Sequence, residues 1–447
     1  MVGVPLVRHG DGEAVLAYQG RRSITVGGFL RDIAALARTL PERPHILNLC
    51  SDRYRFSVGF AAALLRGQVS LLPPNHTPAM VRELLAQYPG LYALNDDPAQ
   101  HAGLETLNYP ALDSTDDEAP AVPEFPARQR AAIVFTSGST GRPLPHDKSW
   151  GAIAASAVAE ARSLGIAPDS GLVLVGTVPP QHMYGLESTV LMALQNGLAL
   201  HSGRPFYPAD ICAAVDAMPR PRMLVTTPIH LRALLEASGE LPPLDRILCA
   251  TAPLSPQLAA QAEARFAAPL FEIYGCTEAG QVASRRTVET AQWRTFEGIR
   301  LRQDGRGTWA AGGSVDTEAL LSDVIELRDA QTFLLHGRMA DLVNIAGKRT
   351  SLAHLNFQLN AIEGVRDGAF FLPDETSDSV TRLMAFVVAP DLSAEALARA
   401  LRERIDAAFL PRPLCFVDAL PRNSTGKLTR ESLRRLAAAQ SAKARPA

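Results

Sequence analysis

The sequence predicts an α/β protein, with a large N-terminal domain of doubly wound sheets, an antiparallel β subdomain within it, and a small α+β C-terminal domain. Three observations carry this prediction. Short apolar strands alternate with helical runs as far as Ile273, glycine-rich turns follow between Gly298 and Leu335, and the pattern changes again after Arg338. Because 447 residues exceed what one hydrophobic core ordinarily serves, two domains are expected.

The alternation begins with a strand at His45–Cys50, a helix at Phe56–Leu65 and a strand at Val69–Leu72. It then recurs: strands are expected at Leu172–Val175, Met223–Thr226, Arg246–Cys249 and Pro269–Ile273, and helices at Leu186–Leu194, Ile229–Leu235 and Leu258–Phe266. Continuously apolar strands between helices are typical of parallel sheets covered on both faces. Ligands of such sheets bind beyond the carboxyl ends of the strands.

Later glycines divide the rest of the chain. Turns at Gly305–Gly307 and Gly312–Gly313 predict antiparallel β structure from Gly298 to Leu335. Beyond Arg338, strands are expected at Leu342–Ile345 and Arg382–Val388, and helices near Leu352–Ile362 and Ala394–Phe409. This unit of roughly 100 residues has the usual size of a domain. The boundary is placed near Met339 and Ala340, which gives domains of residues 1–338 and 341–447.

Composition excludes several classes of protein. Hydrophobic residues make up 47% and charged residues 20%, as in an ordinary globular protein, and the net charge of −2 does not favour nucleic-acid binding. No apolar run is long enough for stable membrane insertion, and the N-terminus lacks a secretory pattern. The five cysteines are scattered without metal-binding spacing, so a cytoplasmic location is expected.

A loop of hydroxyls and glycines follows the apolar strand Ala131–Val134. Its residues are Thr136, Ser137, Gly138, Ser139, Thr140 and Gly141. Glycines let backbone N–H groups approach phosphate oxygens, and the hydroxyls donate further hydrogen bonds. The loop lacks the Gly-Lys-Ser/Thr ending of a Walker A motif. Taken alone, such a run is equally consistent with a flexible loop.

Three further motifs come later in the chain. Tyr274-Gly275-Cys276-Thr277-Glu278 follows a strand, Gly337–Asp341 precedes Gly347-Lys348-Arg349, and Pro421–Lys427 lies near the end. Together with the hydroxyl-rich loop, in this order, they resemble the adenylate-forming superfamily of acyl-CoA synthetases, nonribosomal peptide synthetase adenylation domains and firefly luciferase. The resemblance spans nearly the whole chain. It implies ATP, released as AMP, with Mg²⁺ and a small-molecule carboxylic acid.

The resemblance implies roles for residues around the nucleotide. Thr136–Gly141 would hold the phosphates and Glu278 the metal, in keeping with the carboxylate and phosphate ligands that Mg²⁺ prefers. The remaining nucleotide contacts would be Tyr274, Gly275, Ala252 and Pro253 for adenine, Thr277 for the α-phosphate, Asp323 for the ribose and Arg338 for the ribose or phosphate. Two positions depart from the pattern: Ser322 replaces a glycine, and Leu144 stands where a lysine is usual. Either Lys148 returns to the phosphates, or that contact is absent.

The C-terminal motifs imply a mobile domain with two poses. In one, Lys427 is the catalytic cation of adenylate formation; in the other, Gly347 and Lys348 line a tunnel for a pantetheine thiol. Ser424–Lys427 also fits the S-x-x-K pattern of penicillin-binding enzymes, but the partner motifs of those enzymes are missing. The hinge is Ala340 or Asp341, since the usual position holds alanine.

His182-Met183-Tyr184-Gly185 resembles the family's acyl-pocket motif, which implies that the His182 side chain flanks the pocket; alternatively, His182 is a structural side chain. Amino-acid-activating members place an aspartate near Met183, and a thioether cannot hold an α-ammonium group. We therefore expect a plain carboxylic acid, aromatic or aliphatic, and the likeness described next favours an aryl acid.

The finer likeness is to stand-alone ligases of aryl-polyene and xanthomonadin-type pigment clusters, which load an acyl carrier protein. No dense Lys/Arg cluster assignable to the nucleotide of coenzyme A is apparent in the first part of the chain. A carrier protein is therefore the expected acceptor. The alternatives are an acyl-CoA or aryl-CoA synthetase using coenzyme A, a different second step such as oxygenation or β-lactone closure, and a nucleotide-binding module without catalysis.

Overall fold

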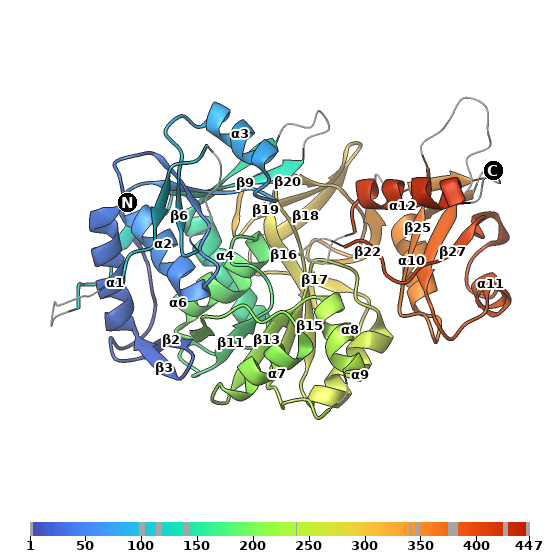
Figure 1. Cartoon of the computed structure of the whole chain (residues 1–447), viewed down its shortest axis with the longest axis horizontal. Helices are drawn as coiled ribbons and strands as arrows, with labels where there is room; N and C mark the ends of the chain where they lie inside the picture. Colours follow the sequence, from blue (N-terminus) through green and yellow to red (C-terminus); the bar gives the residue numbers. More distant parts are fainter. Residues whose placement is uncertain are drawn as a thin grey trace.

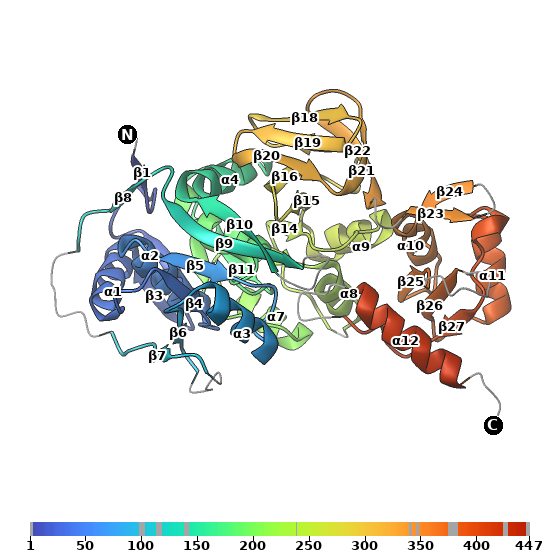
Figure 2. The same ribbon diagram turned by 90° about the horizontal axis from the view of Figure 1, so that it is seen from above.

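The computed structural model describes residues 3–97, 103–112, 119–137, 143–237, 239–338, 342–345, 348–373, 383–422 and 428–443. Two mixed sheets, a three-stranded antiparallel sheet and a two-stranded antiparallel pair form the N-terminal part. The described residues from 342 onward, drawn in orange and red, lie at one end of the long axis in both views (Figures 1 and 2). Within the described ranges, no helix is both long and apolar enough to cross a bilayer.

The first sheet has six strands in the order β10-β9-β5-β4-β6-β7. In that order they span Pro143–Ser149, Arg130–Ser137, Val69–Leu72, His45–Asn48, Tyr92–Asn95 and Thr106–Asn108. The strands from β9 to β7 pair in parallel, and β10 pairs antiparallel with β9. The predicted strands near His45 and Val69 are therefore confirmed.

Strand β10 occupies residues 143–149, a segment for which the sequence pattern predicted no strand. These residues pair with β9, with Pro145 opposite Phe135 and Lys148 opposite Ala132. Strand β10 lies at the edge of its sheet, where a missing N–H on one side costs no ladder hydrogen bond. Propensity alone could not show that this segment would be an edge strand.

The second sheet has eleven strands in the order β21-β22-β17-β16-β15-β14-β13-β11-β12-β2-β3. In that order they span Asp323–Leu327, Thr332–Arg338, Trp293–Thr295, Gly280–Arg285, Leu270–Cys276, Arg246–Cys249, Arg222–Thr226, Val173–Gly176, Ala199–His201, Val15–Gln19 and Arg22–Thr25. The strands from β15 to β2 pair in parallel, and the pairs outside them are antiparallel. The central parallel strands agree with the apolar runs of the sequence.

Helices cover both faces of the second sheet. The helices of the N-terminal part include α1 Val26–Thr39, α2 Arg53–Leu65, α3 Pro78–Gln87, α4 Trp150–Ser163, α7 Pro208–Asp216, α8 Pro228–Glu236 and α9 Pro256–Phe266. Leu174 of β11 belongs to the core that contains α1, α2 and α4, whereas its neighbours Val173 and Val175 belong to the core under α7, α8 and α9. Side chains that alternate across a strand produce this two-sided burial.

The predicted helix at Leu186–Leu194 is made of three segments. A short helix α5 at Met183–Gly185 leads into a π-helix at Leu186–Leu191 and then into α6 at Met192–Asn196. Short π segments interrupt helices rarely and are often found at functional sites.

The antiparallel prediction for Gly298–Leu335 is confirmed. Strands β18 Ile299–Asp304, β19 Gly307–Gly312 and β20 Val315–Leu321 form a three-stranded sheet, and β21 and β22 form the following antiparallel pair. A smaller antiparallel pair joins β1 Gly3–Pro5 to β8 Glu124–Pro126.

The part beyond residue 342 has hydrophobic cores of its own, formed by residues from Val343 to Ala437, whereas the other cores use residues from Leu6 to Phe333. Its elements are β23 Leu342–Ile345, β24 Lys348–Ser351, α10 Leu352–Asn360, β25 Asp367–Phe371, β26 Met384–Val388, α11 Ala394–Arg402, the 3₁₀ turn Ala407–Phe409, β27 Leu414–Phe416 and α12 Arg430–Lys443. Residues 339–341, where the boundary and the hinge were placed, lie outside the described residues.

Candidate active site

Several of the predicted motifs follow neighbouring parallel strands. Strands β11, β14 and β15 belong to the same sheet, with β13 between β11 and β14. Strand β11 leads to the motif His182–Gly185, β14 leads to Ala252 and Pro253, and β15 leads into Gly275–Glu278. Because the carboxyl ends of parallel strands meet at one edge, these segments gather where ligands of such sheets bind.

Glu278 lies near the tip of the hairpin between β15 and β16. Cys276 pairs with Gly280, so Thr277 and Glu278, both half-buried, belong to the connecting turn. A β-carbon on Gly275 would lie 2.5 Å from the carbonyl oxygen of Gly280, so only glycine fits this close approach. Burial raises the pKa of the Cys276 thiol to about 12, which keeps this thiol protonated and poorly nucleophilic.

The hairpin tip meets the end of the first sheet. His146 of β10 is central: its Nε2 lies 3.0 Å from Oγ1 of Thr136 and 4.0 Å from Oε1 of Glu278. Lys148, on the same face of β10, donates from Nζ to the backbone carbonyl of Glu278 at 3.0 Å. The structure thus brings the start of the hydroxyl-rich loop next to the candidate metal carboxylate.

Tyr274 and Asp323 form a second polar contact of the candidate site. The Tyr274 hydroxyl donates to Oδ2 of Asp323 at 2.7 Å. The Tyr274 ring is buried against Trp293 and Phe333, with centroids 5.8 and 5.5 Å away, so it offers little free face to a base. The strand register places Arg338 opposite Asp323, although the Arg338 side chain is outside the description.

The loop after β14 contains an unusual backbone conformation. Thr251 has φ of +80°, a region that β-branched residues rarely enter. Ala252 beside it is half-buried and Pro253 is exposed. Strained residues of this kind cluster at ligand-binding sites, so the loop is a reasonable surface for a planar base.

The acyl motif His182–Gly185 is held in place by the buried side chain of Tyr184. The Tyr184 hydroxyl is buried within 3.1 Å of the carbonyl oxygens of Thr226 and Leu248, and burial raises its pKa. A β-carbon on Gly185 would lie 1.9 Å from the carbonyl oxygen of Pro179, so no larger residue fits there. His182 and Met183 are half-buried, and Nδ1 of His182 accepts from the Tyr184 backbone N–H at 3.3 Å. Tyr184 is therefore a structural anchor, whereas His182 and Met183 are only half-buried.

Two buried carboxyl groups lie beneath the hairpin. Burial raises the pKa of Glu187 to about 7, and the nearby ammonium of Lys148 opposes this rise. Burial also raises the pKa of Glu160 well above its usual range. The Ser156 hydroxyl donates to Glu187 at 3.0 Å, and the Ser188 hydroxyl donates to Glu160 at 2.6 Å.

Several predicted site residues lie wholly or partly outside the description. Outside the described residues lie Gly138, Ser139, Thr140, Gly141, Gly347 and Lys427, and only the backbone is described for Ser137, Arg338 and Lys348. Their roles stay predictions.

Three residues of this region were missed from the sequence. His146 was assigned to no predicted element, Glu187 stands in the predicted helix Leu186–Leu194, and Arg53 precedes the predicted helix Phe56–Leu65. Glu187 had a usable signal, because a carboxylate inside an apolar run must be buried and compensated. His146 and Lys148 are two residues apart, so they share one face only if the segment is a strand. Because the sequence pattern did not predict this strand, it did not place the two side chains together.

The donor chemistry fits Mg²⁺ held jointly with a bound phosphate. No group of three His, Cys, Asp or Glu able to hold a metal occurs within the residues the structure describes. Glu278 offers a single half-buried carboxylate. Mg²⁺ is commonly bound by one or two carboxylates that share it with substrate phosphates, so one carboxylate is sufficient.

The chain resembles characterised proteins in sequence. Residues 8–303 match the family model described as AMP-binding enzyme. A 4-coumarate–CoA ligase of Rhodobacter capsulatus is 31% identical over 300 residues, which cover 66% of this chain and 74% of the relative.

Solved structures share the fold over nearly the whole chain. ATP-bound MatB from Rhodopseudomonas palustris superposes with a TM-score of 0.81 at 19% identity, covering 96% of this chain and 97% of that chain. An O-succinylbenzoate coenzyme A synthetase from Bacillus subtilis, in complex with ATP and a magnesium ion, gives 0.78 at 18% identity, covering 94% and 97%. The mixed α/β fold class is confirmed by these likenesses.

Proposed function

Because this chain belongs to the AMP-binding enzyme family, we propose that it activates a carboxylic acid with ATP and Mg²⁺ and passes the acyl group to a thiol. The carboxylate oxygen attacks the α-phosphorus, the bond to the β-phosphate breaks, and pyrophosphate leaves. A thiolate then attacks the acyl carbon and releases AMP. The observation that carries the proposal is the meeting of Thr136, His146 and Glu278 where the two sheets join.

Within this site each half of the nucleotide has its own residues. Asp323, oriented by the Tyr274 hydroxyl, accepts the ribose hydroxyls, and the loop at Ala252 and Pro253 lies against adenine. Glu278 holds the metal. Thr277 contacts the α-phosphate, and the phosphate loop Thr136–Gly141 and Arg338 hold the remaining oxygens.

The C-terminal residues serve the two half-reactions in turn. We assign the catalytic cation to Lys427 and the thiol tunnel to Gly347 and Lys348, with residues 341–447 rotating against residues 1–338 about Ala340 or Asp341. This division is supported by the separate cores on either side of the boundary.

The acid is proposed to be an aryl acid without an α-amino group. Met183 cannot hold an ammonium group, and His182 and Met183 are the half-buried members of the acyl motif. The relative from Rhodobacter capsulatus is named for an aryl acid, 4-coumarate, which agrees with this choice.

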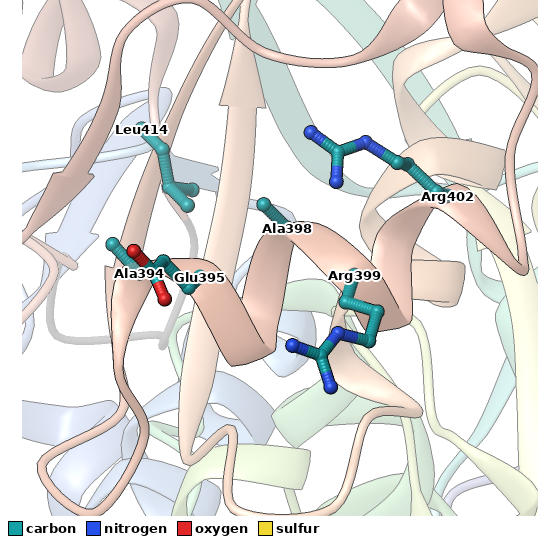
Figure 3. Close-up of a pocket in the computed structure, with 6 residues that line it drawn as sticks. All are labelled: Ala394, Glu395, Ala398, Arg399, Arg402 and Leu414. Carbon is teal, nitrogen blue, oxygen red and sulfur yellow. The ribbon is translucent and has the colours of Figure 1, made fainter.

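For the acceptor we propose the pantetheine arm of an acyl carrier protein, as in aryl-polyene and xanthomonadin-type ligases. An open hollow on α11, lined by Ala394, Glu395, Ala398, Arg399, Arg402 and Leu414, carries two exposed guanidinium groups (Figure 3). Neither guanidinium has an ion-pair partner within the described part of the chain. From residue 342 onward the chain has fifteen Lys and Arg against eleven Asp and Glu. An acidic carrier suits this surface. Coenzyme A is the second candidate, because the relatives are coenzyme A ligases.

Charge reversal on α11 tests the acceptor. Changing Arg399 and Arg402 together to Glu is expected to lower kcat/KM for a holo carrier protein about tenfold or more, mostly because association becomes slower. The dependence of kcat/KM on ionic strength should not become steeper than in the native chain. The rate with coenzyme A should be unchanged. The same reversal of Arg302, an exposed arginine of β18, is the control. If the native chain has the same kcat/KM for coenzyme A as for the carrier protein, it is an acyl-CoA or aryl-CoA synthetase.

The reaction itself is tested by pyrophosphate exchange across aryl and aliphatic acids, followed by product mass with carrier, coenzyme A or no thiol. Acid-dependent exchange supports the proposal. Absence of exchange with every acid would indicate a nucleotide-binding module, and an oxygenated or lactone product would indicate a different second step.

Asp323→Ala is expected to raise KM for ATP about tenfold with a smaller change in kcat, because ribose contacts exist before and during the reaction. Tyr274→Phe should produce a smaller shift of the same kind, since it removes only the hydroxyl that orients Asp323. Asp304→Ala, in an exposed hairpin, is the control. An unchanged KM would mean that another group holds the ribose.

A further inference from the structure

Lys148 is a buried lysine attached to the hairpin that carries Glu278. Its side chain is only 5% exposed, and Nζ donates to the backbone carbonyl of Glu278 at 3.0 Å. It lies four residues beyond Leu144 on the same face of β10, which is about 13 Å along the strand. Lys148 is therefore displaced along the strand from the position where a phosphate-binding lysine is usual.

A second buried ionisable group, Glu187, lies within electrostatic reach of the Lys148 ammonium. Glu187, on the π-helix Leu186–Leu191, is 3% exposed, and its pKa is raised by burial and lowered by Lys148. The Glu187 carboxyl also accepts from the Ser156 hydroxyl at 3.0 Å and from the backbone N–H of Gln281. An ammonium and a carboxyl of this kind stabilise each other only while both are present.

The hairpin is held at two points by this buried layer. Gln281, the second residue of β16, donates from its side chain to Ser188 at 2.8 Å, and its backbone contacts Glu187. Lys148 holds the tip at Glu278. Between these points the pairing of Cys276 with Gly280 leaves a short connecting turn. The backbone from which the Glu278 carboxylate projects is therefore held in part by the hydrogen bond from Lys148.

We propose that the buried Lys148, through its hydrogen bond to the Glu278 carbonyl, is a positioning residue that holds the Glu278 carboxylate in place for Mg²⁺ and does not contact phosphate. The inference rests on the proposed function, because it takes Glu278 as the metal ligand. Residues that orient a ligand from behind typically change metal affinity 10–100-fold when removed. The structure assigns this work to a lysine displaced from the phosphate loop, where Leu144 stands.

The test separates metal-dependent from metal-independent ATP binding. Calorimetric titrations with ATP are made in Mg²⁺ and in EDTA for Lys148→Met, for Glu187→Gln and for the double variant, with Lys443→Met as the matched control. Lys148→Met is expected to weaken ATP binding in Mg²⁺ by about 10–100-fold and to leave binding in EDTA unchanged. The Mg²⁺ concentration for half-maximal pyrophosphate exchange should rise in parallel. The control should match the native chain.

The double variant keeps the test decisive if Lys148→Met alone folds poorly, since it leaves neither buried charge unpaired. It should show the same loss of Mg²⁺-dependent binding. Equal losses of ATP affinity in Mg²⁺ and in EDTA would mean that Lys148 contacts phosphate. ATP affinity equal to that of the native chain in the double variant would mean that the loss in Lys148→Met comes from an unpaired Glu187. Either result overturns the inference. Failure of the native chain to exchange pyrophosphate would refute the proposed function alone, because the ATP titrations do not depend on turnover.

Discussion

Replacing Lys427 with alanine is expected to slow acyl-adenylate formation by about 10²–10³-fold while leaving ATP binding intact. A cation that stabilises charge only as the α-phosphate is attacked contributes roughly 3–4 kcal/mol to that one transition state. Lys427 lies outside the described residues, but Arg422 and Leu428 on either side of its segment form a β-bridge. Arg422 is in turn fixed by Asp367, whose carboxylate oxygens are 2.9 and 3.0 Å away.

Two assays measure the two half-reactions separately. Pyrophosphate exchange reports adenylate formation, and single-turnover transfer from a synthetic acyl-adenylate reports thioester formation. Lys427→Ala should lose the first and keep the second, with Lys443→Ala behaving as the native chain in both. Equal losses in the two assays would exclude a role confined to adenylate formation and return Lys427 to a structural or general binding role.

The second large effect is expected from replacing Arg53 with methionine, which should lower the free energy of unfolding of the N-terminal part by more than about 3 kcal/mol. The Arg53 guanidinium is fully buried and donates to five acceptors: the Thr189 hydroxyl at 3.1 Å and the carbonyls of Gly176, Val178, His201 and Gly203 at 2.7–3.1 Å. Burial lowers its pKa to about 10, so the group stays charged at neutral pH. Removing it leaves these buried acceptors unpaired.

Arg53→Met keeps most of the apolar stem, so its effect isolates the hydrogen bonds. Denaturant unfolding followed by tryptophan fluorescence measures the change, and Arg66→Met, at the exposed end of the same helix, is the control. Because Gly176 and Val178 precede the acyl motif, KM for the acid should also rise in any folded fraction. A loss below about 1 kcal/mol would show that water replaces the guanidinium at little cost.

Local sequence patterns specify many of the secondary-structure elements of this protein. Continuous apolar runs at Met223–Thr226 and Arg246–Cys249 specify buried parallel strands, because a strand covered on both faces needs apolar side chains on both. The hairpin glycines specify the antiparallel subdomain for a similar local reason: they supply the turns. The motif around Glu278 follows such a strand, so its place at the carboxyl edge also comes from the sequence. Lys427 and the hinge stay predictions.

Other features depend on contacts between segments far apart in the chain, which local pattern does not encode. Strand β10 tolerates Pro143 and Pro145 because it lies at a sheet edge, and its pairing with β9 turns Lys148 toward a carbonyl 130 residues away. The burial of Glu187 and the five hydrogen bonds of Arg53 arise in the same way, since their partners come from other strands and helices. The sequence determined which chemistry is present; only tertiary packing decided which of these charges face a ligand and which stabilise the site from beneath.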